Sequence, residues 1–172
     1  MAKHDALVID YTVYKDGIEY LGTTEITLPD VEYLSETISG GGISGEVEDI
    51  ITGHISAMTT TMNWRVVTKR AVQLCEPKYH KIEVRVAQQQ LDSKDGSTSV
   101  LSAKHVLKIK PKKTSFGKVA AASTADVSGD YATSYFATYI NGEKVTEIDP
   151  LNFICLINGT DYLADVRHAL GK

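Results

Sequence analysis

The stretch Tyr131–Leu163, YATSYFATYINGEKVTEIDPLNFICLINGTDYL, holds the clearest succession of strand and turn signals in the chain. Residues 131–140 alternate between apolar and polar side chains and lead into Asn141-Gly142. Asn-Gly between two such segments is a strong signal for a tight β-hairpin. Two shorter strands are expected after it, over 143–148 and 153–157. The stretch therefore predicts antiparallel β-structure.

The N-terminal part repeats this pattern around another turn. Alternating residues flank Lys15-Asp16-Gly17, and Pro29 is expected to end the returning strand because it cannot donate a ladder hydrogen bond. Residues 30–39 then predict a strand or extended arm. Gly40-Gly41-Gly42, with Gly45 close behind, predicts a flexible glycine-rich loop at about 39–53.

The middle of the chain adds one helix. Residues 54–64 predict a half-solvated strand, and residues 65–76 predict a helix because their apolar side chains recur at helical spacing, with Asn63 as the cap. A hairpin is expected over 81–91 and 99–109, ended by Pro111. The segment 112–128 is interpreted as a loop, and 160–171 as a C-terminal helix capped by Thr160.

These segments predict a single domain over residues 1–172. Its fold class is mainly β, a sandwich or partial barrel with one flanking α-helix and a short C-terminal helix. No apolar run approaches the roughly 20 residues of a membrane-spanning helix, and the N-terminus has no signal-peptide pattern. We therefore expect a soluble protein that is made in the cytoplasm.

Charge and cysteine content limit the classes of partner. The net charge of −4 argues against general nucleic-acid affinity, which requires clustered excess Lys and Arg. Cys75 and Cys155 lie far apart with no metal-binding spacing, so both are expected to be reduced, buried thiols. This composition favours neither a secreted disulfide framework nor a DNA-binding protein.

The residues predict no catalytic, cofactor or metal site. The five histidines are scattered singly, and Cys75 shares the apolar stripe of the expected helix. The segment Gly40–Gly45 lacks the Gly-Lys-Ser/Thr ending of a phosphate-binding loop. We therefore expect that the protein is not an enzyme.

A basic stripe is expected on one strand face, because Lys104, Lys108, Lys110 and Lys112 share the same parity. An ordinary solvated face and a contact with an acidic protein partner, such as a sheath protein, explain it equally well, with DNA as a third alternative.

An ordered set of residues across the chain resembles the major tail tube proteins of contractile-tailed phages and phage-tail-like bacteriocins. It includes Lys15-Asp16-Gly17, Tyr20-Leu21-Gly22 and Gly40-Gly41-Gly42 in the first half, while positions 47–129 match in pattern more than in identity. The C-terminal third carries most of the resemblance, through Glu147, Asp149, Pro150, Asn152, Asn158, Gly159, Asp161, Leu163 and Arg167.

The resemblance implies a structural role. Such subunits close into hexameric rings with a ring-shaped β-barrel, and the rings stack into a tube inside a contractile sheath. A baseplate and a tail terminator bound the tube, and contraction drives it through the target envelope. The tube conducts DNA as passing cargo in a phage, or permeabilises the target membrane in a bacteriocin. The fold is related to the type VI secretion tube, so an effector-carrying tube and, less favoured, a stand-alone binding module remain alternatives.

Two surfaces follow as expectations for the assembled tail or tail-like particle. The loop residues Gly40, Gly41, Gly42, Ile43 and Gly45 are expected to contact the next ring. The polar parity of the first hairpin is expected to face the channel, where carboxylates would repel DNA phosphates. It comprises Asp10, Thr12, Glu19, Thr23, Glu25 and Thr27.

Overall fold

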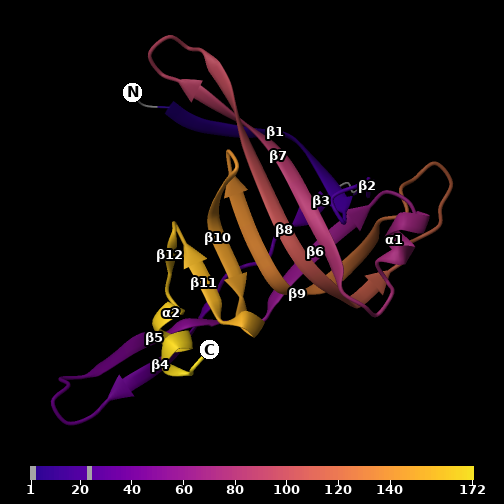
Figure 1. Cartoon of the computed structure of the whole chain (residues 1–172). Helices are drawn as coiled ribbons and strands as arrows, with labels where there is room; N and C mark the ends of the chain where they lie inside the picture. The colour runs from indigo at the N-terminus through magenta and orange to yellow at the C-terminus, as the bar shows by residue number, and fades with distance from the viewer. Residues whose placement is uncertain (1–2, 23–24) are drawn as a thin grey trace.

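The computed structural model describes residues 3–22 and 25–172, and these form a mainly β-protein with two short α-helices (Figure 1). This confirms the prediction that the chain is mainly β. The strands are β1 (Lys3–Lys15), β2 (Glu19–Tyr20), β3 (Glu25–Thr27), β4 (Tyr33–Ser39), β5 (Glu46–Ile55), β6 (Met58–Trp64), β7 (His80–Asp92), β8 (Thr98–Ser115), β9 (Val127–Ile140), β10 (Glu143–Asp149), β11 (Ile154–Ile157) and β12 (Thr160–Asp161). The helices are α1 (Lys69–Gln73) and α2 (Ala164–Ala169), with a 3-10 turn, η1 (Pro150–Asn152).

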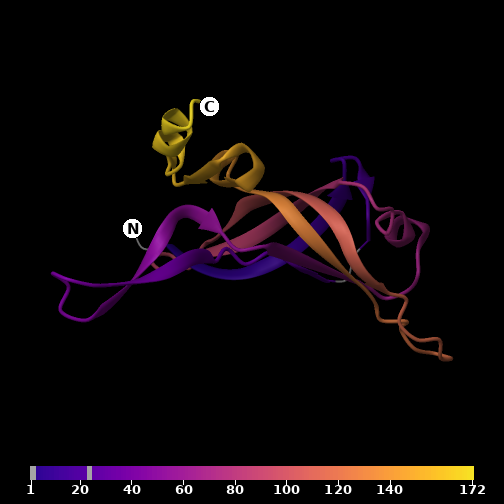
Figure 2. The same cartoon turned by 90° about the horizontal axis from the view of Figure 1, so that it is seen from below.

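The strands form one large antiparallel sheet in the order β12-β11-β10-β9-β8-β7-β1-β2. The long strand β9 belongs to two layers, because its first half pairs with β6 while its second half pairs with β10. β3 adds to the free side of β6. The sheet therefore folds over on itself (Figures 1 and 2), but the described strands do not close into a barrel within one chain.

The core lies between these two layers. In β6 every second side chain is buried, and the buried set comprises Met58, Thr60, Met62 and Trp64. Val13 of β1, Ile82 and Val84 of β7, Leu107 and Ile109 of β8, and Tyr131 of β9 complete the same cluster. Thr60 is the polar exception, and its hydroxyl satisfies its hydrogen bond with Thr133 at 2.7 Å.

The predicted loop at 39–53 is a β-hairpin instead. β4 and β5 pair with each other in a separate two-stranded sheet, so only residues 40–45 form the turn. Nearly all side chains of these two strands are exposed. β4 agrees with the strand or extended arm predicted over 30–39, whereas β5 was missed because its exposed side chains show no half-buried alternation.

The helix predictions were too long. α1 begins after Thr68, whose side chain accepts a hydrogen bond from the N–H of Ala71, so Thr68 is the cap and not Asn63. α2 begins only after Leu163, because Thr160 pairs in β12 and does not cap a helix. Each helix is only about one turn long, and Ala71 of α1 is the only residue buried within either of them.

Pro111 does not end its strand, and 112–115 is not a loop. β8 runs on to Ser115, with a register shift between Pro111 and Lys113 that marks a bulge. Bulges are positions at which a sheet tolerates proline. The true loop between β8 and β9 covers 116–126.

Candidate assembly surfaces

One face of the large sheet packs on the core, and no other layer formed by residues 3–22 and 25–172 covers the opposite face. Directly paired residues place a continuous row on this open face across five strands: Thr12, Arg85, Lys104, Tyr139 and Lys144. We call this surface the open sheet face. Beside this row, Asp10 lies opposite Ala87, and Ala87 lies opposite Ser102.

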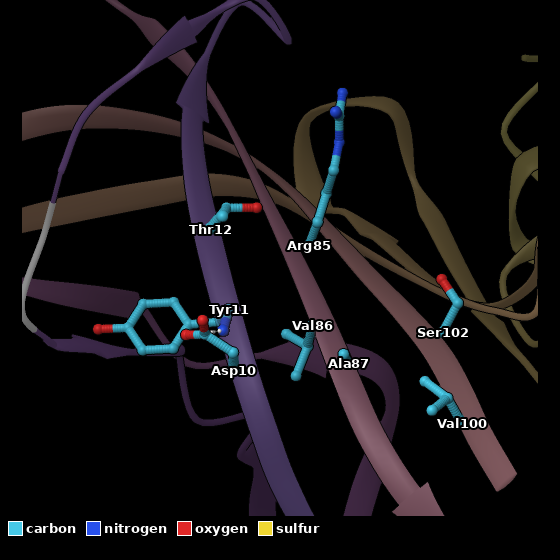
Figure 3. A pocket seen from close by; sticks show the side chains of 8 residues that line it. All are labelled: Asp10, Tyr11, Thr12, Arg85, Val86, Ala87, Val100 and Ser102. Atoms are coloured by element: carbon cyan, nitrogen blue, oxygen red, sulfur yellow. Dashed lines mark hydrogen bonds between the residues drawn. The ribbon is translucent and has the colours of Figure 1, made fainter.

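The open sheet face has a shallow depression between β1, β7 and β8 (Figure 3). Asp10 and Thr12 of β1, Arg85 of β7 and Ser102 of β8 are among the polar residues that line it, and its volume is about 300 Å³. The depression combines a carboxylate, a guanidinium and hydroxyl groups. Val86, Ala87 and Val100 also line it, so the depression is open to water but mixes polar groups with apolar side chains.

The predicted lysine stripe lies on β8 and is interleaved with tyrosines. The side chains of Lys104 and Lys108 lie over the rings of Tyr139 and Tyr135, with Nζ at 4.6 Å and 5.2 Å from the ring centres. Lys110 lies similarly over Tyr79, at 5.6 Å. Such cation–π contacts hold the lysine side chains in place on the sheet. These tyrosines were not predicted from the sequence, because only the register between neighbouring strands shows which tyrosine lies beside each lysine.

The six residues predicted to share a channel face do not share one. Thr12 pairs with Arg85 on the open sheet face. Glu19 pairs with Lys15, and Lys15 points to the same side of β1 as the buried Val13, so Glu19 lies on the opposite face from Thr12. Glu19 approaches Arg70 of α1 at 3.7 Å.

Glu25 and Thr27 are on β3 in the second layer, where Glu25 accepts a hydrogen bond from Asn63 at 3.4 Å. Thr23 lies outside the described residues. Of the five members of the predicted set that the structure describes, only Asp10 and Thr12 lie on the open sheet face.

The predicted face fails because β2 and β3 do not continue the face of β1 that carries Asp10 and Thr12. Bulges also change the faces within β1 itself. The pairing with β7 shifts between Asp5 and Leu7 and again between Val8 and Asp10. Each shift reverses the face of the residues that follow. Leu7 and Ile9 are consequently 71% and 53% exposed, although simple alternation assigned them to the core with Val13.

The turn of the β4–β5 hairpin holds the predicted contact residues Gly40, Gly41, Gly42, Ile43 and Gly45, all exposed. A Cβ built at any of these four glycines would meet no atom within 4 Å. The turn therefore lies free of the rest of the chain, as a contact surface for another molecule would.

The C-terminal residues that carried the family resemblance have structural roles in this fold. Glu147 accepts hydrogen bonds from Tyr135 and Lys144, at 2.7 Å and 2.8 Å. Asp149 caps η1 by accepting bonds from the backbone and side chain of Asn152, and Pro150 begins that turn. Asn158 and Gly159 have φ values of 48° and 81°, the left-handed conformation that a tight hairpin requires.

Asp161 organises the end of the chain. Its carboxylate forms an ion pair with Arg167 at 2.6 Å and accepts bonds from the backbone N–H groups of Cys155 and Leu163. Partial burial raises the pKa of Asp161, but the bonds from Arg167 and the two N–H groups outweigh it and lower the pKa overall. Arg167 also donates to the carbonyl of Phe153, so the two residues tie α2 to β11.

The outer edge of β1 is the main unpaired backbone of the large sheet. β7 pairs with one side of β1, and on the other side β2 pairs only with Tyr14 and Lys15. Among the described residues, no strand pairs with that side from residue 3 to residue 12. An exposed edge of this length is a template for a strand of another chain.

Among residues 3–22 and 25–172, no group of three His, Cys, Asp or Glu side chains could hold a metal ion. No helix of the described chain has the length and hydropathy needed to cross a bilayer.

Comparisons with known proteins agree with this architecture. A solved extracellular contractile injection system (PVC) supplies two similar chains. Its sheath/tube terminator in the extended state matches with a TM-score of 0.55 and 11% identity over 79% of this chain and 97% of that chain. A chain of its sheath-tube complex matches with a TM-score of 0.53 and 13% identity over 79% and 92% of the two chains. At these identities the likeness concerns the fold.

No curated protein sequence matches the chain. The family model for phage tail tube protein FII, however, matches residues 6–171, which is nearly the whole sequence. The chain therefore belongs to the phage tail tube protein FII family.

Proposed function

We propose that the protein is the structural subunit of the inner tube of a contractile injection system, and that its copies close into hexameric rings that stack into a hollow tube. The unpaired edge of β1 carries this proposal, because edge-to-edge closure of the sheets is the arrangement that removes such edges. Family membership and the contractile-system neighbours support it. The role requires no catalysis.

In this ring the open sheet face lines the channel. The second layer and α1 cover the other face, and they require the larger outer circumference. The channel wall would then repeat Asp10 and Thr12 beside a basic row that includes Arg85 and Lys104. Its charge is mixed, in contrast to the acidic and hydroxyl-bearing wall expected from the sequence.

The β4–β5 hairpin makes the contact between rings. It extends away from the rest of the subunit (Figure 1), and its turn is free of intramolecular contacts. The outer surface of the tube contacts the sheath, and the ends of the tube contact the baseplate and tail terminator. DNA is cargo in a phage, whereas a DNA-free particle uses the tube to breach the target membrane.

The test is assembly of the purified protein, followed by light scattering and negative-stain microscopy over a range of concentrations. Rings or tubes with a central channel are expected. A type VI-like tube would give the same images but would retain effector proteins when these are co-expressed. A stand-alone binding module would remain monomeric at every concentration.

A further inference from the structure

The charges of the chain are segregated along the sequence. Residues 16–64 contain nine Asp and Glu and no Lys or Arg. Residues 65–118 contain thirteen Lys and Arg and only four Asp and Glu. The two segments therefore carry formal charges of −9 and +9, although the whole chain carries only −4.

The fold places parts of these segments at opposite ends of the molecule. The arm, residues 33–55, is the β4–β5 hairpin, and both views show its tip at the end remote from α1 (Figures 1 and 2). The α1 end comprises residues 65–79 and 110–126. Its parts are joined by a hydrogen bond from Cys75 to Thr114 at 3.5 Å and by one from the N–H of Ala125 to the carbonyl of Arg65 at 2.6 Å.

Both ends combine their charge with exposed apolar side chains. On the arm these are Leu34, Ile38, Ile43, Val47, Ile50 and Ile51. On the α1 end they are Val66, Val67, Val72, Tyr79, Phe116 and Val119. Clusters of exposed apolar residues on a folded subunit mark surfaces that another protein covers.

The carboxylates of the arm have no Lys or Arg within the arm to balance their charge. Glu36 lies directly opposite Asp49 on the same face of the hairpin, and like charges in that position destabilise a strand pair. Since the arm contains no Lys or Arg, no cation of its own offsets this repulsion. A cation supplied by another molecule would do so.

The α1 end has cations to supply. Lys69, Lys112 and Lys113 are exposed, and within the described part of the chain none of them forms an ion pair. The acidic arm and this basic surface point away from each other in one subunit. They are able to meet only between two copies, in a head-to-tail contact that repeats without limit.

We propose that the arm of one copy docks on the α1 end of a second copy, with Glu36 and Asp49 facing the lysines at positions 69 and 112. The inference rests on the proposed tube, in which the second copy lies in the next ring. Opposite charge sets the register of the contact and speeds encounter, while the apolar side chains of the two surfaces bury one another.

The test reverses charge on one surface at a time. The arm variant E36K/D49K and the end variant K69E/K112E are each expected to lose tubes at low salt while the subunit keeps its circular dichroism spectrum. The matched control E143K/D95K reverses two exposed carboxylates, one on β10 and one in the turn between β7 and β8, away from both surfaces, and should form tubes like the wild type.

Mixing the two defective variants is the decisive step. The basic arm of E36K/D49K is complementary to the acidic α1 end of K69E/K112E. The acidic, unaltered arm of K69E/K112E is in turn complementary to the basic, unaltered α1 end of E36K/D49K. The mixture should therefore restore tubes that neither variant forms alone. Restored tubes would support the proposal even if each variant is somewhat less stable than wild type.

The outcomes separate this inference from the proposed function. If the wild type forms no rings or tubes, the proposed function and the inference are both wrong. If the wild type and E36K/D49K form tubes equally well, the inference alone is wrong. If both variants lose tubes and their mixture does not recover them, pairing of the two surfaces by charge is refuted.

Discussion

Leu163 occupies the space that a side chain at Gly53 would need. A Cβ at Gly53 would lie 2.4 Å from the Leu163 side chain, and Gly53 has a φ of +70°. Leu163 is itself buried, held between the C-terminal strands and α2. The base of the arm is therefore clamped on the C-terminal segment, so the direction of the arm depends on a contact 110 positions away in sequence.

Gly53→Ala should destabilise the clamp. The methyl group would overlap Leu163 at a left-handed backbone position, and the expected loss in the free energy of unfolding is about 1–3 kcal/mol. Tube growth should fall further than stability, because the arm would be redirected. Thermal unfolding of Gly41→Ala provides the control, since no atom lies within 4 Å of a Cβ there. Equal melting temperatures for the two variants would contradict the clamp.

Asp161→Asn should reveal a pH-dependent contribution to stability. The folded-state pKa of Asp161 lies below its ordinary value of 3.8, so its ionised form stabilises the fold above that pH. The wild type should exceed D161N by about 1–2 kcal/mol near neutral pH. The difference should shrink as pH falls below 3.8 through the lowered pKa. Glu143→Gln, an exposed change on β10, should show no such convergence.

The hydrogen bond between Thr60 and Thr133 should behave as a coupled pair. Thr60→Val leaves the buried Thr133 hydroxyl without its partner and should cost about 1–3 kcal/mol of unfolding free energy. The double variant T60V/T133V removes both hydroxyls and should be less destabilised than the sum of the two single variants. Denaturant unfolding of all four proteins measures the coupling. Simple additivity would show that the bond contributes little.

Much of the fold was predictable because its signals are local. The Asn141-Gly142 hairpin and the strands around it were predicted correctly, since a turn residue pair and strict alternation coincide there. In the arm, β4 was predicted within 30–39, but β5 was not, because its side chains are exposed on both faces and carry no alternation. The channel face was wrong in part because β3 pairs with β6 in the second layer and Glu19 has the core-facing parity of β1, which local alternation does not reveal. Two bulges in β1, which leave no mark in this sequence, also changed the faces of Leu7 and Ile9.

The resemblance identified the C-terminal residues as a group, but the contacts that they make could not be predicted from the sequence. The resemblance named Asp161, Leu163 and Arg167, yet only the structure joins Asp161 to Arg167 and Leu163 to Gly53. Contacts between positions this far apart depend on the path of the chain between them. For the same reason, the tyrosines beneath the lysine stripe could not be assigned from spacing.

Shortening the arm should block stacking without unfolding the subunit. Ser35 lies opposite Ile50, so residues 36–49 can be replaced by Asn-Gly, which suits a two-residue hairpin turn. The shortened protein should retain its melting temperature and form rings or single subunits, but no tubes, in negative-stain images. Tubes of normal length would refute the assignment of the arm to contacts between rings.

Cysteine labelling should test whether the open sheet face lines the channel. Ser102 is exposed in the single subunit, so Ser102→Cys in a Cys75→Ser background should react with a large polyethylene-glycol maleimide. In long tubes the same thiol should be protected, because the polymer cannot fill the channel. Glu143→Cys in the same background reports the labelling of another exposed site. Equal labelling of Ser102→Cys in tubes and subunits would place the face outside the channel.

The most direct test of the central claim is a density map of the particles that the purified wild-type protein forms. We predict a hollow tube of stacked six-membered rings, in which strands of neighbouring subunits continue across the edge of β1. Asp10 and Arg85 should then face the channel. A protein that stays strictly monomeric at high concentration, or rings in which the edge of β1 remains unpaired, would contradict the account.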